Sequence, residues 1–161
     1  MSRCIRLRET KSGLDVRLEL FDDLAPRNAE LFWQIAGAGQ AHEAIHAMWT
    51  GPEISCPVTG AALPAKAVAG GVPSENATSF PAAGEIATVF ASRGTWKGMP
   101  PVDFFDIGLF YGDGARMLMP MGWIMGSVCA RVAPADLAAF QAGCRTIRRN
   151  GVCHLVFEHD V

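Results

Sequence analysis

The sequence predicts a mainly β domain whose strands close into a β-barrel with α-helices at its ends. Short segments of alternating apolar and polar residues, separated by turns rich in glycine and proline, run through most of the 161 residues. Only two segments have helical periodicity, one early and one late in the chain. Many short strands with two helices favour a barrel. We expect residues 1–161 to form a single domain, because the chain has no repeat and no linker.

The first elements are a pair of strands and a helix. Residues 3–9 and 14–20 alternate apolar with charged side chains, and the turn between them predicts a hairpin. Residues 22–37 predict a helix, because Pro26 suits its first turn and glycines end it. The order strand, strand, helix places the first helix directly after the hairpin.

The rest of the chain predicts strands, loops and a second helix. Residues 59–73 and 93–103 are expected to be loops, because they consist largely of small residues, glycine and proline. The second helix is expected at 133–151, where Phe140 and Cys144 lie at helical spacing. Strands are predicted at 44–49, 53–58, 75–80, 84–90, 104–111, 126–132 and 152–159.

The composition argues against several classes of protein. The net charge of −2 does not favour nucleic-acid binding, and no apolar run is long enough to cross a membrane. The first residues lack the apolar core of a signal peptide. The five cysteines include no C-x-x-C pair, which favours reduced, mostly buried thiols in the cytoplasm, with Cys56 the most accessible.

Neither a cofactor nor a phosphate ligand is predicted from the glycine-rich segments. None of them leads into a G-K-[ST] sequence, and none has the G-x-G-x-x-G pattern after a strand. Half of the residues are hydrophobic, which is compatible with a homo-oligomer as well as with a large core. We therefore expect no cofactor, no nucleic-acid partner and no membrane partner.

One motif suggests a metal. His42 to His46 spell H-E-x-x-H, in which two histidines on a helix bind zinc and Glu43 activates water. The glycines before it and the TGP sequence after it leave too short a segment for such a helix. Trp49 and Pro52 stand where the extended zinc signature requires a glycine and a third histidine. On a strand, Glu43 would point away from both histidines. No metal site is therefore predicted, and a zinc hydrolase is kept as a minor alternative.

Six polar and aromatic residues are candidates for a ligand-binding site. His46 suits a general base or a hydrogen-bonding contact, and Trp49 suits stacking on a ligand, although both residue types also occur in cores. Glu75 and Asn76 are expected either to cap a turn or to line a polar pocket. The candidates are His46, Trp49, Glu75, Asn76, Tyr111 and Arg116.

Two interpretations of Arg116 are open at this stage. It follows the only tyrosine, Tyr111, and the turn sequence GDG. Arg116 either forms an ion pair with Asp113 or faces the pocket and binds a carboxylate. The methionine-rich run after it predicts core packing, an adaptable apolar pocket or an oligomer contact.

Several segments resemble cyclophilins. LELFDDLAPRNAELFWQIAG (18–37) is similar to their second strand and first helix, and AIHAMWTG (44–51) to their Phe-His-Arg strand. GSVCARVAPADLAAFQAG (126–143) is similar to a later strand and helix. A closer resemblance is to an uncharacterised bacterial family, a domain of unknown function with a cyclophilin-like fold. Its hallmarks are similar to residues 25–33, 45–51, 75–86, 110–117 and 126–132. The resemblance implies a closed eight-stranded β-barrel capped by two α-helices.

The resemblance does not extend to the arginine that cyclophilins use for prolyl isomerisation. Ala47 stands at the matching position, and GPEISCP (51–57) replaces the Gln-Gly-Gly segment. A methyl group cannot replace a guanidinium that stabilises a twisted amide. Strong prolyl isomerase activity is therefore not expected.

Four functional hypotheses follow. The favoured one is a barrel that binds a small molecule or a short peptide-like ligand. The second is an enzyme acting on a small amide or cyclic substrate, with His46 and Glu75 as acid and base. A zinc hydrolase and a weak peptidyl-prolyl isomerase are the remaining alternatives, so the catalytic residues are left unknown.

Overall fold

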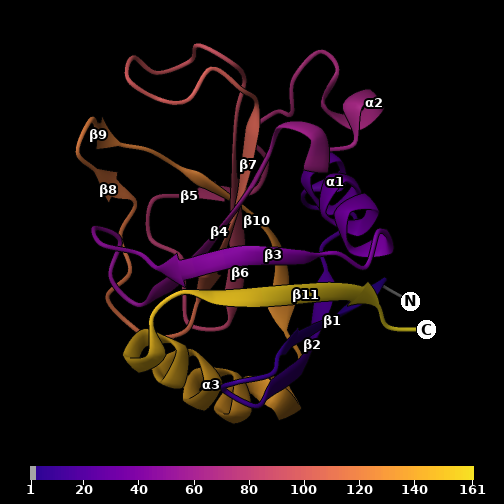
Figure 1. Ribbon diagram of the computed structural model, residues 1–161, viewed down its shortest axis with the longest axis vertical. Coiled ribbons are helices and arrows are strands. Elements are labelled where there is room, and N and C mark those ends of the chain that lie inside the picture. Colours follow the sequence, from indigo (N-terminus) through magenta and orange to yellow (C-terminus); the bar gives the residue numbers. More distant parts are fainter. Residues whose placement is uncertain (1–2) are drawn as a thin grey trace.

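The computed structural model describes residues 3–161, in which eight strands form a closed antiparallel barrel (Figure 1). The strands follow the order β2-β1-β11-β3-β4-β7-β6-β10, and β10 pairs again with β2, which closes the barrel. These strands are β1 (Cys4–Glu9), β2 (Leu14–Leu20), β3 (Ala41–His46), β4 (Glu53–Thr59), β6 (Glu85–Ala91), β7 (Phe104–Phe110), β10 (Gly126–Val132) and β11 (Cys153–His159). The predicted closed barrel is confirmed, while residues 1 and 2 of the predicted single domain lie outside the described residues.

Two long helices pack against the barrel, as the sequence predicts. α1 (Pro26–Gly37) contacts β11 and β10, whereas α3 (Leu137–Asn150) contacts β2, β3 and β4 (Figure 1). A short 3₁₀ turn, η2 (Pro134–Asp136), leads into α3. Among residues 3–161, no helix has the length and apolar character needed to cross a membrane.

Alternate residues of each strand point into the barrel and form its core. In β4, Ile54 and Val58 are fully buried, whereas Pro57 between them is exposed. The rings of Phe32 in α1 and Phe157 in β11 meet edge to face, with centroids 5.0 Å apart. The core therefore joins the barrel interior to the helices that cover it.

The expected accessibility of Cys56 is wrong. Strand alternation turns this side chain into the core, where it is fully buried between Ile54 and Val58. Burial raises the pKa of its thiol, because a thiolate would lose its hydration there. All five cysteines are buried, so the expectation of buried thiols is confirmed.

Several boundaries differ from those predicted. β3 begins and ends three residues before the expected strand at 44–49. Of the expected strand at 75–80, only β5 (Ala77–Thr78) forms, because Asn76 has a left-handed backbone with φ 43°. The expected loop at 59–73 contains η1 (Gly60–Ala62) and α2 (Ala65–Val68), the latter beginning after Pro64.

A small hairpin stands outside the barrel. β8 (Leu118–Met119) pairs with β9 (Gly122–Trp123) and with no barrel strand. In Figure 1 it lies on the left, on the opposite side of the barrel from α1. Phe80 packs against Trp123, with ring centroids 5.5 Å apart. The methionine-rich segment thus lies outside the barrel core, next to the site described below.

Candidate functional site

A cavity of about 200 Å³ lies on the outer face of the barrel. It is enclosed by the end of β3 and the turn after it, by β4, β6 and β7, and by the segment that contains the β8–β9 hairpin. Most of its walls are apolar. The lining residues are Ile45, His46, Ala47, Met48, Trp49, Thr50, Glu53, Ser55, Val89, Phe104, Asp106, Met117, Met119 and Ile124.

Two carboxylates and a hydroxyl enter this cavity from neighbouring strands. Ser55 lies opposite Gly108 and Glu53 opposite Phe110 in the β4–β7 pairing. Residues that face each other across an antiparallel pair project to the same side, and so do residues two apart. Glu53, Ser55 and Asp106 therefore share the outer face, while the residues between them point into the core.

Glu53 is almost completely buried, with 3% of its surface exposed. The hydroxyl of Thr50 donates a hydrogen bond to its Oε2 atom. Gly108 on β7 leaves the space that the carboxyl group needs. A Cβ atom at Gly108 would overlap Oε1 of Glu53 and lie 2.8 Å from the ring of Phe110. A glycine in the middle of a buried strand thus has a specific packing reason here.

Asp106 is half-buried in the wall of the cavity. It accepts a hydrogen bond of 2.8 Å from the hydroxyl of Ser55. Protein atoms surround its carboxyl group, and the part of its surface that remains accessible faces the cavity. Within residues 3–161, neither Asp106 nor Glu53 forms an ion pair. The two carboxyl groups thus depend on hydroxyl and backbone donors alone.

This environment raises the pKa of both carboxyl groups. Burial, with the negative charge of Asp106 as a second cause, raises the pKa of Glu53 to about 8. Burial also raises the pKa of Asp106 to about 6, against hydrogen bonds from Ser55 and the Cys56 backbone. At neutral pH the pair therefore holds one proton and one negative charge.

His46 is held in one tautomer beside the cavity. Its Nδ1 atom lies 2.8 Å from the carbonyl oxygen of Ala47, which can only accept, so Nδ1 carries the proton. Tyr111 then donates its hydroxyl proton to Nε2 over 2.9 Å. Burial lowers the pKa of His46, which favours the neutral ring. With both nitrogens engaged, His46 supplies shape and polarity to the cavity and is not a free base.

The zinc-protease geometry does not form. His42 to His46 lie on β3, where His42 is buried and Glu43 is exposed on the opposite face. Within the described chain, no three histidine, cysteine or acidic side chains gather as metal ligands. The glutamate therefore cannot reach water on a metal held by both histidines, and the zinc hydrolase hypothesis is wrong.

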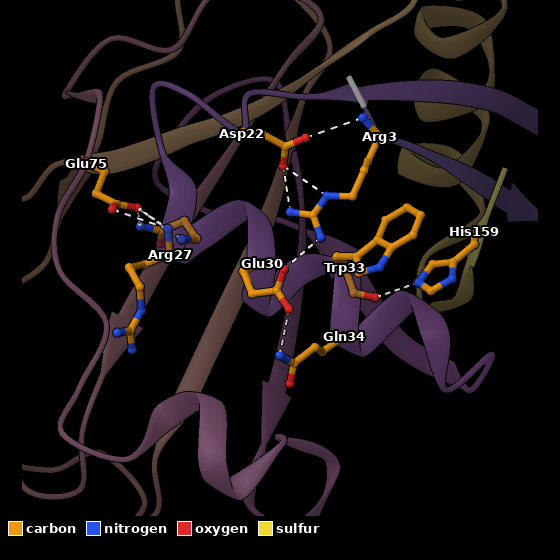
Figure 2. Close-up of polar contacts among 9 residues, drawn as sticks. Arg3, Asp22, Arg27, Glu30, Trp33, Gln34, Glu75 and His159 are labelled. Atoms are coloured by element: carbon orange, nitrogen blue, oxygen red, sulfur yellow. Dashed lines mark hydrogen bonds and ion pairs between the residues drawn. The ribbon is translucent and has the colours of Figure 1, made fainter. Parts of the chain in front are cut away.

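The expected acid–base pair of His46 and Glu75 does not form either. Glu75 caps the N-terminus of α1, where its carboxylate accepts the backbone N–H groups of Arg27 and Asn28 at 3.1 and 3.0 Å. The side-chain amide of Asn28 donates to it over 2.8 Å. Figure 2 shows Glu75 against the start of α1 at Arg27. The capping interpretation of Glu75 is thus the arrangement observed.

The other candidates have separate positions. Trp49 lines the cavity and is 48% exposed. Asn76 donates its amide to the carbonyl oxygen of Val128 over 2.8 Å and so fixes β10. Arg116 is exposed, is absent from the cavity wall and pairs with no acid of the described chain, including Asp113. Of the six candidates, His46 and Trp49 line the cavity, and Tyr111 reaches it through His46.

Sequence reasoning missed the two carboxylates of the site. A signal for Asp106 is present, because it is the only charged residue in the otherwise apolar strand FFDIGLF. A carboxylate in such a strand is costly unless it has a partner or a ligand. No comparable signal exists for Glu53, whose burial depends on Gly108 of a strand far away in the sequence.

Comparisons with known proteins agree with this fold. A family model described as "Protein of unknown function (DUF3830)" matches residues 7–158. The structure of McbB in complex with tryptophan is similar over 97% of this chain, with a TM-score of 0.55 and 14% identity. This chain spans only 44% of the McbB chain.

A cyclophilin-type peptidyl-prolyl cis-trans isomerase from Cryptosporidium parvum is similar over the whole chain and over 99% of its own. Its TM-score is 0.51 and its identity 13%. No curated protein matches the sequence significantly. These likenesses show a cyclophilin-like fold and, at such identities, nothing about activity.

Proposed function

The chain belongs to the DUF3830 family of proteins of unknown function, and we propose that it binds a small molecule or a short peptide-like ligand in the cavity of Glu53 and Asp106. The observation that supports this proposal is a pair of carboxyl groups, with Glu53 buried and Asp106 half-buried, at the wall of a mostly apolar cavity. Apolar walls with a few polar groups that converge on one point are typical of ligand sites.

The energetics favour a binding role over a structural one. Burying a carboxylate without a cation costs several kcal/mol, on the order of what a domain's net stability provides. A role in packing would be better served by apolar residues of similar size. Groups retained at such a cost, and left open to a cavity, are candidates for contact with a ligand.

The cavity restricts the size of the ligand. Its volume of about 200 Å³ is below the roughly 300 Å³ at which sites for drug-sized molecules begin. A small organic molecule, or one side chain of a peptide, is therefore the occupant we propose. We also propose a cytoplasmic location, which the five buried cysteines support.

Prolyl isomerisation is not part of this proposal. Ala47 lines the cavity at the position that resembles the cyclophilin arginine, and no lysine or arginine is among the lining residues. The two carboxyl groups give the cavity the opposite charge to that of a guanidinium. An X-Pro peptide assay should accordingly detect no isomerisation above the uncatalysed rate.

The proposal is tested with a fragment library observed by ¹H–¹⁵N NMR. Fragments that bind should shift the signals of residues 45–50 and 104–106. Val89→Phe should abolish these shifts, because Val89 lines the cavity and a larger ring would fill it. Val152→Phe is the matched control, since Val152 directly precedes β11, is exposed and does not line the cavity. If no fragment shifts these signals, or if Val89→Phe leaves them unchanged, the proposal is wrong.

A second candidate function is acid–base catalysis on the bound molecule. It is supported by the unequal pKa values of the pair, about 8 for Glu53 and about 6 for Asp106, which suit an acid and a base respectively. NMR of a panel of small amides and lactams should then detect a conversion with a maximum between these values. Turnover that survives in both Glu53→Gln and Asp106→Asn would exclude this role.

A further inference from the structure

We propose that the ligand of the Glu53–Asp106 cavity carries a protonated amine on a small apolar body. This inference rests on the proposed function and adds the chemical class of the ligand. The cavity offers negative charge and hydrogen-bond acceptors at one wall and apolar surface elsewhere. A primary ammonium group has three donors, no acceptor and one positive charge, which complements that wall.

The Glu53–Asp106 pair lacks a positively charged partner. Elsewhere in residues 3–161, buried or half-buried acids have a cation or backbone N–H donors. Asp22 pairs with Arg3 at 2.6 Å, and Glu9 accepts the N–H groups of Lys11 and Ser12. No such partner faces Glu53 or Asp106, and the cavity wall contains no lysine or arginine. Arg148 lines a neighbouring cavity beside His46 and forms no ion pair with either carboxylate. A bound cation would supply the charge that the protein leaves out.

The two carboxyl groups also have hydrogen-bonding capacity that the protein does not use. Thr50 donates to Oε2 of Glu53, whereas Oε1 accepts from no group in the described part of the chain. Glu53 is at least nine-tenths buried and lines the cavity. The Asp106 carboxylate therefore offers an acceptor to a donor that arrives from the cavity, and so does Oε1 of Glu53 once a cation beside it displaces the proton of that carboxyl group. An ammonium group fits this better than a carbonyl or a carboxylate, which only accept.

The rest of the cavity wall suits an organic cation. Trp49 is an aromatic face that attracts a cation as well as an apolar body. Met117, Met119 and Ile124 provide adaptable apolar contacts. Calcium would need six or more oxygen ligands, and no cluster of three candidate metal ligands occurs within residues 3–161. An organic ammonium therefore suits this wall better than a metal ion.

The test uses two probes of equal shape, phenethylamine and 2-phenylethanol. Both are titrated at pH 7 into the full-length protein and followed by the NMR signals of residues 45–50 and 104–106. The amine should bind at least tenfold more tightly than the alcohol, because only the amine carries positive charge. Asp106→Asn should reduce amine affinity at least tenfold and change alcohol affinity less than twofold.

Glu43→Gln is the matched control for charge in general. Glu43 is an exposed carboxylate on β3 that is absent from the cavity wall, so its loss should change amine affinity less than twofold. Equal binding of amine and alcohol in the wild type would contradict the amine class and leave the binding pocket intact. Binding of neither probe would overturn this inference, and the fragment screen decides separately whether the pocket binds anything.

A final comparison distinguishes a free amine from a peptide amine. The tripeptide Gly-Lys-Gly, blocked at both ends, is titrated beside the same peptide with norleucine in place of lysine. Binding of the lysine peptide more tightly than phenethylamine assigns the site to a peptide side chain. Tighter binding of phenethylamine assigns it to a free small molecule. Asp106→Asn should reduce the affinity of whichever source binds, and an unchanged affinity would contradict the role of the carboxylates.

Discussion

Glu75 and Glu53 have the same side chain in two opposite environments. Glu75 accepts three N–H donors at the N-terminus of α1, where the helix dipole adds favourable potential. Glu53 accepts one hydrogen bond, from the hydroxyl of Thr50, lies beside a second carboxyl group and faces a cavity. Glu75 therefore has hydrogen-bond donors for its carboxylate, whereas Glu53 has unused hydrogen-bonding capacity.

This difference separates a structural carboxylate from a candidate functional one. A satisfied carboxylate contributes to stability, and its removal leaves donors without partners. A carboxyl group that is buried with few donors reduces stability, and its retention calls for another explanation. Substitutions around Glu53 and Glu75, made one environment at a time, test whether the two carboxyl groups differ in this way.

The largest effect is expected from closing the space at Gly108. Gly108→Ala should destabilise the protein by about 3 kcal/mol, because the new Cβ atom overlaps Oε1 of Glu53 and crowds Phe110. Urea unfolding measures this cost. The cost should fall by at least about 1 kcal/mol when Glu53→Ala is present as well. An unchanged cost in that background would show that the carboxyl group does not need this space.

The next largest effect is expected at the satisfied glutamate. Glu75→Ala should destabilise the protein by about 2 kcal/mol, because the first N–H groups of α1 and the amide of Asn28 lose their acceptor. Glu75→Gln should cost less, since it retains an acceptor oxygen. Glu43→Ala on the exposed face of β3 is the control and should stay within about 0.5 kcal/mol. Equal stability of Glu75→Ala and the control would contradict a capping role.

The fold could be predicted because its signals are local. Alternation in residues 14–20 and helical spacing in 133–151 each indicate an element without knowledge of its neighbours. The resemblance to cyclophilins then indicates that the strands close into an eight-stranded barrel. Errors occurred where local signals are weak, as at Asn76, whose left-handed backbone shortens the predicted strand.

The candidate site was harder to predict because it depends on distant contacts. The sequence leaves capping and a pocket open for Glu75 and does not indicate its partner, because Asn28 lies 47 residues earlier. Ala25, the residue at the N-cap of α1, makes no side-chain cap of its own. Glu53 and Asp106 meet only through the β4–β7 register, which the sequence does not specify.

A more gradual effect is expected in the pH dependence of stability. The folded pKa of Glu53, about 8, exceeds its ordinary value of 4.5, so the native state keeps a proton that the unfolded state has lost. Stability should therefore decrease as pH rises from 4.5 to 8, by about 1 kcal/mol per pH unit from this group. Glu53→Gln should remove that part of the slope, which urea unfolding at several pH values measures.

The lowered pKa values of His42 and His46 act in the opposite direction below pH 6.5. They are present in both proteins, so they cancel in the difference between wild type and Glu53→Gln. Glu75→Gln serves as the comparison variant, because it also replaces a carboxylate by an amide but outside the cavity. A wild-type slope that persists in Glu53→Gln would mean that Glu53 is ionised in the native state.

The smallest effect is expected at His46, where both ring nitrogens already have hydrogen-bond partners. Tyr111→Phe removes the hydroxyl that donates to Nε2 of His46 and should cost about 1 kcal/mol. Because this hydrogen bond stabilises the neutral ring, its loss should raise the pKa of His46 relative to the wild type. NMR titration of the ring in the wild type and the variant measures the change. An unchanged His46 titration would show that Tyr111 does not fix the tautomer. His46 would then be available as a base in the cavity. The two carboxyl groups would no longer be the only polar groups of the cavity wall with unused hydrogen-bonding capacity.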